Sequence, residues 1–441
     1  MDKKGAGSKK TGVTRRQFLT VLGAAAAGGL LTLWERLWRP LSGVEADAVS
    51  LTPQAYLPYV ARDGTPPTPT PTLTPTPIPP GAKPRVVRVH DAQATSWDFE
   101  SGWYGDYVDI ARVEAMMVRG LTALTGMSTA SAAWAQLLPG YATGKIIAIK
   151  ISLNNASGCD DDDNQIDALP QTLIALTKTL TEAGVDQHDI WFYDATKENA
   201  RRIPTRLSAP VWDRYPNVRF FGKAMCGAEQ VDYDMNDDDL RVDFTDLNGN
   251  IQPRWLTPIL KMATYLINVP LFKYHGIHPV SLGFKNHFGS INRVDDPEQR
   301  SNDLHSYIRP SDSYYSSTYS PLVDVYRHPY IKDKTVLTIG DALFGAFGAQ
   351  AIPEAWGTFE NTSPNSLFFA LDPVALDCVM TDFIRAESAY PPHSSITDAA
   401  YDYLFLAQSA GLGVCEGTPS QPGGDPWGTG YTDIDYLPIE M

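Results

Sequence analysis

The stretch IIAIKISL (residues 146–153), followed by IDALPQTLIALTKTLTEA (166–183) and IWFYD (190–194), decides the fold class. The first and third segments are short and rich in Ile and aromatic residues, which is typical of buried strands. The middle segment has apolar residues at helical spacing. A strand, a helix and a second strand in this order predict two parallel strands joined by a crossover helix.

The same alternation continues along the chain and predicts an α/β fold with a largely parallel sheet, helices on both faces, and one large domain. Two polar stretches, 232–250 and 311–320, are expected to be surface excursions. Binding sites in such sheets lie at the carboxyl ends of the strands. The further expected strands are 86–90, 218–222, 265–270, 335–341 and 367–371, and the further expected helices are 108–124, 280–288, 373–385 and 398–411.

The N-terminus carries TRRQFL (residues 14–19) directly before an Ala- and Gly-rich apolar run, an order typical of a twin-arginine export signal. The run is shorter than the roughly 20 residues that span a bilayer. The segment Ala46-Asp47-Ala48 fits a small-x-small cleavage site. We therefore expect residues 1–48 to be a signal peptide read by the twin-arginine translocase. The protein is then periplasmic or at the cell surface, touching the membrane only through an uncleaved signal.

A Pro/Thr-rich segment follows the signal. In TPPTPTPTLTPTPIPPGAKP (residues 65–84) dense proline removes backbone donors and fixes φ, which favours an extended tether. Residues 49–84 are accordingly predicted to be a linker, and residues 85–441 the α/β domain.

Charge and cysteine content exclude several classes of protein. The formal net charge is −15 although the first 48 residues are basic, so the domain is strongly acidic, and no basic stripe marks a nucleic-acid partner. The four cysteines are far apart and form no CxxC pair, so an iron–sulfur cluster within this chain is not expected. They are either disulfides, in any of three full pairings, or buried thiols. The cysteines are Cys159, Cys226, Cys378 and Cys415.

The densest group of chemically capable residues lies in NVPLFKYHGIHPVSLGFKNHFG (residues 268–289), where a strand leads through glycine into an expected helix. His278 and Lys285 share one face of that helix. Lys273 and Lys285 supply positive charge, and His275 or His278 supplies a metal ligand or a proton relay, which suits an anionic or metal-bound ligand. The alternative is a capping histidine beside solvated lysines.

Four further polar residues interrupt or follow apolar runs. Asp341 ends an expected strand and precedes small residues, a position where α/β folds place catalytic or metal-binding carboxylates. The alternative is an aspartate in an ordinary turn. Lys150 lies inside an apolar strand, so it lines a site, pairs, or reaches solvent from an edge. Asp372 precedes Pro373 and is expected to cap a helix, with Asp377 one turn on. The usual serine-hydrolase, nucleotide-binding and HExxH motifs do not occur.

The segments IIAIKISLNN, INVPLFKYHGIHPVSLGFKNHFGSINR, LHSYI, TVLTIGDALFGAFG and LFFALDPVALDCVMTDFI occur in this order from about 145 to 384. Together they resemble the family known as domain of unknown function 362. Some relatives carry ferredoxin-like iron–sulfur modules, which implies redox chemistry there, but this chain lacks such cysteines. The resemblance implies that one cleft is lined by Lys150, Lys273, His275, Lys285, Asn286, His305, Asp341, Asp372 and Asp377.

These observations lead to an exported protein of unassigned reaction with an anion- or metal-binding cleft, acting as an enzyme that depends on a divalent metal or a cofactor. The alternative is a non-catalytic module that binds an anionic ligand or a cofactor, and a third reading is a structural surface protein. The expected catalytic residues are Lys273, His275, Lys285 and Asp341, the cofactor-binding residues Lys150, Asn286 and Asp377, and the metal ligands His275, His278 and His305.

Overall fold

A computed structural model describes residues 82–441 except 154–158, 161–162, 195–202, 223–225, 247–248, 277–279, 293–303, 349–350, 388–395 and 417–429. The predicted signal peptide and almost all of the predicted linker lie outside the described residues. Among the helices that are described, none is long and apolar enough to cross a membrane.

A nine-stranded sheet forms the centre of the domain, in the order β11-β1-β10-β9-β7-β2-β3-β4, with β8 added alongside β9. Only β10 runs antiparallel to its neighbours. The expected α/β fold with a largely parallel sheet is therefore confirmed. The strands are β1 (Arg85–His90), β2 (Ile147–Lys150), β3 (Ile190–Tyr193), β4 (Arg219–Phe221), β7 (Tyr265–Asn268), β8 (Leu271–Tyr274), β9 (Thr335–Phe347), β10 (Ser366–Ala370) and β11 (Asp435–Glu440).

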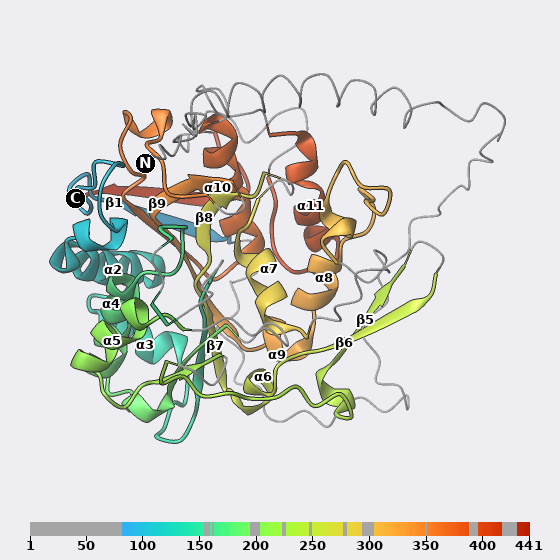
Figure 1. The fold of residues 1–441 in the computed structure, drawn as a ribbon, viewed down its shortest axis with the longest axis horizontal. Helices are drawn as coiled ribbons and strands as arrows, with labels where there is room; N and C mark the ends of the chain where they lie inside the picture. The colour runs from blue at the N-terminus through green and yellow to red at the C-terminus, as the bar shows by residue number, and fades with distance from the viewer. Residues whose placement is uncertain are drawn as a thin grey trace, which may run out of the picture. The chain divides into compact units, whose positions relative to one another are not determined.

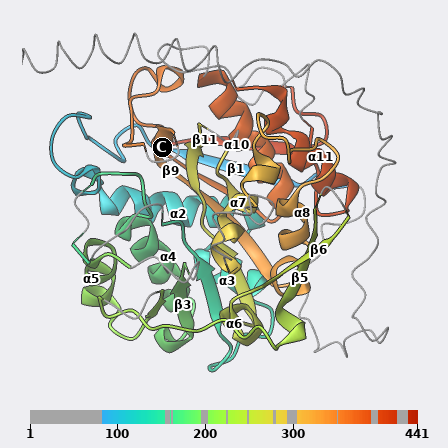
Figure 2. The same ribbon diagram turned by 45° about the vertical axis from the view of Figure 1, so that its right-hand side comes forward.

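Helices cover both faces of this sheet (Figures 1 and 2). On β2, Ile147 and Ile149 point into the core beneath α2 to α5, whereas Ala148 points into the core beneath α6 to α11, so both faces are apolar. The helices are α2 (Ile110–Thr125), α3 (Ala130–Leu137), α4 (Pro170–Glu182), α5 (Thr205–Arg214), α6 (Pro258–Met262), α7 (Gly283–Asn286), α8 (Pro321–Tyr326), α9 (Pro329–Lys332), α10 (Pro373–Glu387) and α11 (Asp402–Ser409).

The strand β9 is longer than the sequence predicts. It was expected to end at Asp341, but it continues to Phe347 and pairs there with β8. Glycine permits this extension, because a Cβ on Gly345 would lie 2.5 Å from the Trp356 ring. Asp341 is therefore inside a buried strand and not at the start of a loop.

A hairpin occupies part of the stretch expected to be a polar surface excursion at 232–250. Strands β5 (Arg241–Thr245) and β6 (Ile251–Trp255) pair antiparallel in a separate two-stranded sheet. Val242 and Phe244 are buried while Asp243 between them is exposed, which is the alternation of a strand with one covered face. The expected surface excursion thus contains a strand, whose short alternation the abundance of aspartate obscured.

One disulfide joins Cys159, which follows β2, to Cys226, which follows β4, with a Cα to Cα distance of 5.3 Å. The other two cysteines, Cys378 and Cys415, are free and buried, and their sulfur atoms lie 3.7 Å apart. The hydrogen bond between these two thiols and their burial raise the pKa of Cys378. The structure therefore combines the two alternatives left open by the sequence, with one disulfide and two buried thiols.

We expect a defined count of reactive thiols from this pairing. Iodoacetamide reacts with the thiolate, so the native protein should take up no label at Cys378 or Cys415 near pH 8. After unfolding without reductant two cysteines should be alkylated, and with reductant all four, as read by intact-mass spectrometry. Four labels in the unreduced, unfolded protein would contradict the Cys159–Cys226 bond.

Candidate functional site

The carboxyl ends of β2 and β7 mark the point where the order of the strands reverses. The chain proceeds from β2 to β3 and β4 on one side, whereas β7 and β9 lie on the other side. Lys150 ends β2, Asn268 ends β7, and the two residues are directly paired. Ligands of open α/β sheets bind at such a switch point, so its polar residues are the first candidates for a site.

Lys150 is buried here and makes a complete set of hydrogen bonds. Its Nζ lies 2.5 Å from the Ile151 carbonyl oxygen, 3.1 Å from Asp194 Oδ1 and 3.0 Å from Asn286 Oδ1. These three acceptors match the three donors of an ammonium group. Asp194 Oδ2 accepts a further bond of 2.8 Å from the Leu153 amide. Lys150 thus connects three segments of the interior.

Two asparagines extend this network to α7. Asn286 Nδ2 donates to Asn268 Oδ1 at 2.8 Å, and Asn268 Nδ2 donates to the Gly283 carbonyl at 3.0 Å. Both asparagines are buried. Because α7 has only four residues, these contacts fix its position more than its own backbone hydrogen bonds do.

The short helical turn after α7, η4 (His287–Ser290), covers the ion pair closely. A Cβ on Gly289 would lie 2.4 Å from both Lys150 Nζ and Asp194 Oδ1, so only glycine fits. Burial and the nearby Lys150 ammonium hold the pKa of His287 well below its usual value, so this imidazole is neutral. Its Nδ1 lies 3.1 Å from Ser290 Oγ, which in turn lies 3.0 Å from the Tyr193 hydroxyl.

Asp377, on α10, holds the start of α7. Its two oxygens accept from the Gly283 amide at 2.8 Å, the Phe284 amide at 3.0 Å and the Tyr403 hydroxyl at 3.0 Å. Burial raises the pKa of Asp377 to about 7, against the effect of these donors. Lys150, Asn286 and Asp377, the three predicted cofactor-binding residues, are thus all attached to α7.

Three basic side chains lie around α7 and the turn η4 that follows it. His275 follows β8, His305 precedes the turn η6 (Ser306–Ile308), and Lys285 is on α7; all three are half-buried. The His275 and His305 ring centroids are 6.4 Å apart, and His305 lies 5.4 Å from the ring of Phe288. The Lys285 Nζ is 5.9 Å from the same ring. We call His275, Lys285 and His305 the basic cluster.

Two predicted catalytic residues lie elsewhere. Asp341 is on the face of the sheet covered by α2 to α5, where its carboxylate accepts from Thr172 Oγ1 on α4 at 2.7 Å and burial raises its pKa. Lys273 is buried on β8. Its neighbour Phe272 packs in the core beneath α6 to α11, so by strand alternation Lys273 points to the other face of the sheet. The sheet therefore separates Asp341 from Lys285, in contrast to the expectation of one shared cleft.

The segment that was expected to carry part of the metal-ligand set is less helical than predicted. The helix expected at 280–288 begins only at Gly283, because Val280 instead forms a β-bridge with Tyr274. His278 itself lies outside the described residues. Among the described residues no group of three or more His, Cys, Asp or Glu side chains could hold a metal ion.

The remaining predicted residue, Asp372, caps α10 as expected. Its Oδ1 accepts from the amides of Val374 and Ala375, both at 2.9 Å, and its Oδ2 accepts from the Val414 amide at 2.9 Å. Burial raises the pKa of Asp372 to about 6. These bonds account for both oxygens without a ligand.

Sequence reasoning missed several members of the network. Asp194 and Asn268 each end an apolar strand, a signal that was weighed for Asp341 but not for these two residues. Gly289 and Ser290 carry no signal of their own, since their roles depend on the approach of η4 to the ion pair.

The fold and this geometry define an α/β protein with a mostly parallel sheet and a buried polar network at its switch point. The chain belongs to the family described as domain of unknown function (DUF362), whose family model matches residues 161–382. The matched region runs from the segment after β2 into α10 and so contains α7 and the basic cluster. No curated protein matches the chain.

Proposed function

We propose that this chain is an exported protein that binds an anionic, oxygen-rich ligand at the basic cluster of His275, Lys285 and His305. The observation that carries the proposal is the approach of three basic side chains from three separate segments: His305 and Lys285 both lie near the Phe288 ring, and His275 lies beside His305. The chain as a whole is acidic, with a net charge of −15, so a local concentration of basic groups is unusual for it.

The rigidity of the support favours binding. Lys285 is adjacent in sequence to Asn286, which is tied to Lys150 and Asn268 in the interior. A binding residue held by a fixed helix loses less conformational freedom on binding than one on a free loop. Imidazolium and ammonium groups are donors to phosphate and carboxylate oxygens. Export rests on the twin-arginine pattern at 14–19.

The test is calorimetric titration of the exported protein with inorganic phosphate and with citrate. We expect Lys285→Met and His275→Ala to weaken binding of the preferred probe by roughly ten-fold each, because a charge-assisted hydrogen bond is lost. Lys332→Met and His188→Ala are matched controls, since both residues are exposed on other parts of the domain. Binding that is absent, or equal in all variants, would rule the proposal out.

A divalent metal is the second candidate ligand, favoured by the His275–His305 separation of 6.4 Å between ring centroids. With metal–nitrogen bonds of about 2.0–2.1 Å, two imidazoles at this separation are near enough to share one ion. Mass spectrometry of the natively exported protein should then find a metal that His275→Ala removes. Metal-free protein that binds phosphate would leave the anion site as the function of the cluster.

A further inference from the structure

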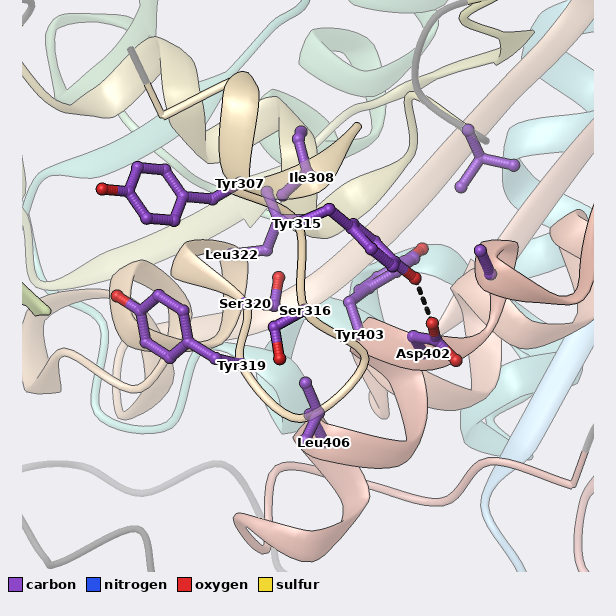
Figure 3. Close-up of a pocket in the computed structure, with 12 residues that line it drawn as sticks. Tyr307, Ile308, Tyr315, Ser316, Tyr319, Ser320, Leu322, Asp402, Tyr403 and Leu406 are labelled. Atoms are coloured by element: carbon purple, nitrogen blue, oxygen red, sulfur yellow. Dashed lines mark hydrogen bonds between the residues drawn. The ribbon is translucent and has the colours of Figure 1, made fainter. Parts of the chain in front are cut away.

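A second site lies among η6, the segment before α8, and α11 (Figure 3). The pocket has an empty volume of about 380 Å³, counting the part that is open to solvent. Four tyrosines line it together with aliphatic side chains; they are Tyr307, Tyr315, Tyr319 and Tyr403.

The tyrosine hydroxyls are largely engaged by the protein. The Tyr403 hydroxyl donates to Asp377 at 3.0 Å, and the Tyr319 hydroxyl accepts from the Thr245 amide at 3.1 Å. The Tyr315 hydroxyl donates to Asp402, as the dashed line in Figure 3 shows. The tyrosines therefore offer ring surface to a ligand more than hydroxyl groups, which disfavours a ligand with many hydroxyls, such as a sugar.

Two polar groups remain for a ligand. Among the described residues that line the pocket, Asp402 is the only charged one, and Tyr315 engages its Oδ2, which leaves Oδ1 for a ligand. Ser320 is 4% exposed, and its Oγ has no hydrogen-bond partner among the described residues. A buried hydroxyl without a partner is uncommon in folded proteins. The described lining residues include no Lys, Arg or His, so the Asp402 carboxylate disfavours an anionic ligand.

We propose that this pocket binds a small organic ammonium ion, with Asp402 as its counter-ion, Ser320 Oγ as a hydrogen-bond acceptor and the tyrosine rings around its apolar body. Tyrosine rings attract cations through their negative faces, and Asp402 supplies the opposite charge. Leu322 and Leu406 provide apolar contact for the rest of the ligand. The pocket shares no lining residue with the basic cluster, which would take a ligand of opposite charge.

The test compares benzylamine with its neutral isostere benzyl alcohol by calorimetry on the full exported chain. The dissociation constant of benzylamine should be lower than that of benzyl alcohol by roughly ten-fold or more, because only the amine pairs with Asp402. Asp402→Asn keeps the shape of the side chain and should remove this preference. Asp398→Asn is the matched control, since Asp398 pairs with Arg385 and does not line the pocket.

A second variant tests the site in case Asp402→Asn does not fold. Ser320→Ala removes only the unpartnered hydroxyl and should weaken benzylamine binding by roughly two- to five-fold, with an unchanged thermal melt. Equal binding of the two probes would overturn the proposal. So would a failure of benzylamine to bind, or unchanged affinity in folded Asp402→Asn.

Discussion

Replacing Lys150 with methionine should lower the free energy of unfolding by about 3–5 kcal/mol, because it leaves the Asp194 carboxylate buried without its cation. Lys150 and Asp194 are 1% and 3% exposed, so water does not replace the lost contact. The substitution also removes the donor from which Asn286 Oδ1 and the Ile151 carbonyl oxygen accept a hydrogen bond. Urea denaturation followed by circular dichroism measures the change.

The double variant Lys150→Met/Asp194→Asn distinguishes an unpaired charge from lost packing. If the unpaired carboxylate dominates, the double variant should recover much of the stability that the single variant loses. Lys332→Met, on the exposed helix α9, should change the free energy by less than about 0.5 kcal/mol. A loss below about 1 kcal/mol in Lys150→Met would mean that the pair contributes little to holding α7.

Local sequence patterns predicted most of the sheet. β2, α4 and β3 were expected from apolar runs and helical spacing, and their parallel pairing is observed. β8 and β11 were not expected. β8 is a four-residue strand that is stabilised by pairing with β9, and β11 is a half-exposed edge strand paired with β1. Strands that depend on such distant partners have little local signal.

The orientation of side chains was harder to predict than the elements. The family resemblance implied that Asp341 and His275 line one cleft, but a strand that continues to Phe347 fixes Asp341 by alternation on the face of α4. A one-residue difference in a strand reverses the face. The partnership of Lys150 with Asn286 was implied only by family resemblance, since the two are 136 residues apart.

The second large effect is expected at Asp377. Asp377→Ala should destabilise the protein by about 3 kcal/mol, because it leaves two α7 amides and the Tyr403 hydroxyl buried without an acceptor. Asp377→Asn keeps one carbonyl oxygen at this position and should cost less. The exposed Asp333→Asn serves as the control. A loss in the alanine variant no larger than in the control would mean that α7 is held by Lys150 and the asparagines alone.

The same carboxyl group should make stability depend on pH. Burial raises the pKa of Asp377 to about 7 from the ordinary value of 3.8, so between these values the folded state keeps a proton that the unfolded state has lost. The resulting stabilisation is complete below about pH 4 and is lost as the pH rises through 7, by at most about 1.4 kcal/mol per pH unit. Burial also raises the pKa of Asp372 and Asp382, which adds to the same trend.

Urea denaturation at pH 5, 6, 7 and 8 should therefore show a free energy of unfolding that falls with pH, and less steeply in Asp377→Asn than in the wild type. The comparison isolates Asp377, because the other buried aspartates are unchanged in the variant. The opposite result is a free energy of unfolding that rises with pH in the wild type and does not rise in Asp377→Asn. That result would contradict the prediction. Asp377 would then be ionised in the folded state, and the two amides and Tyr403 would outweigh its burial.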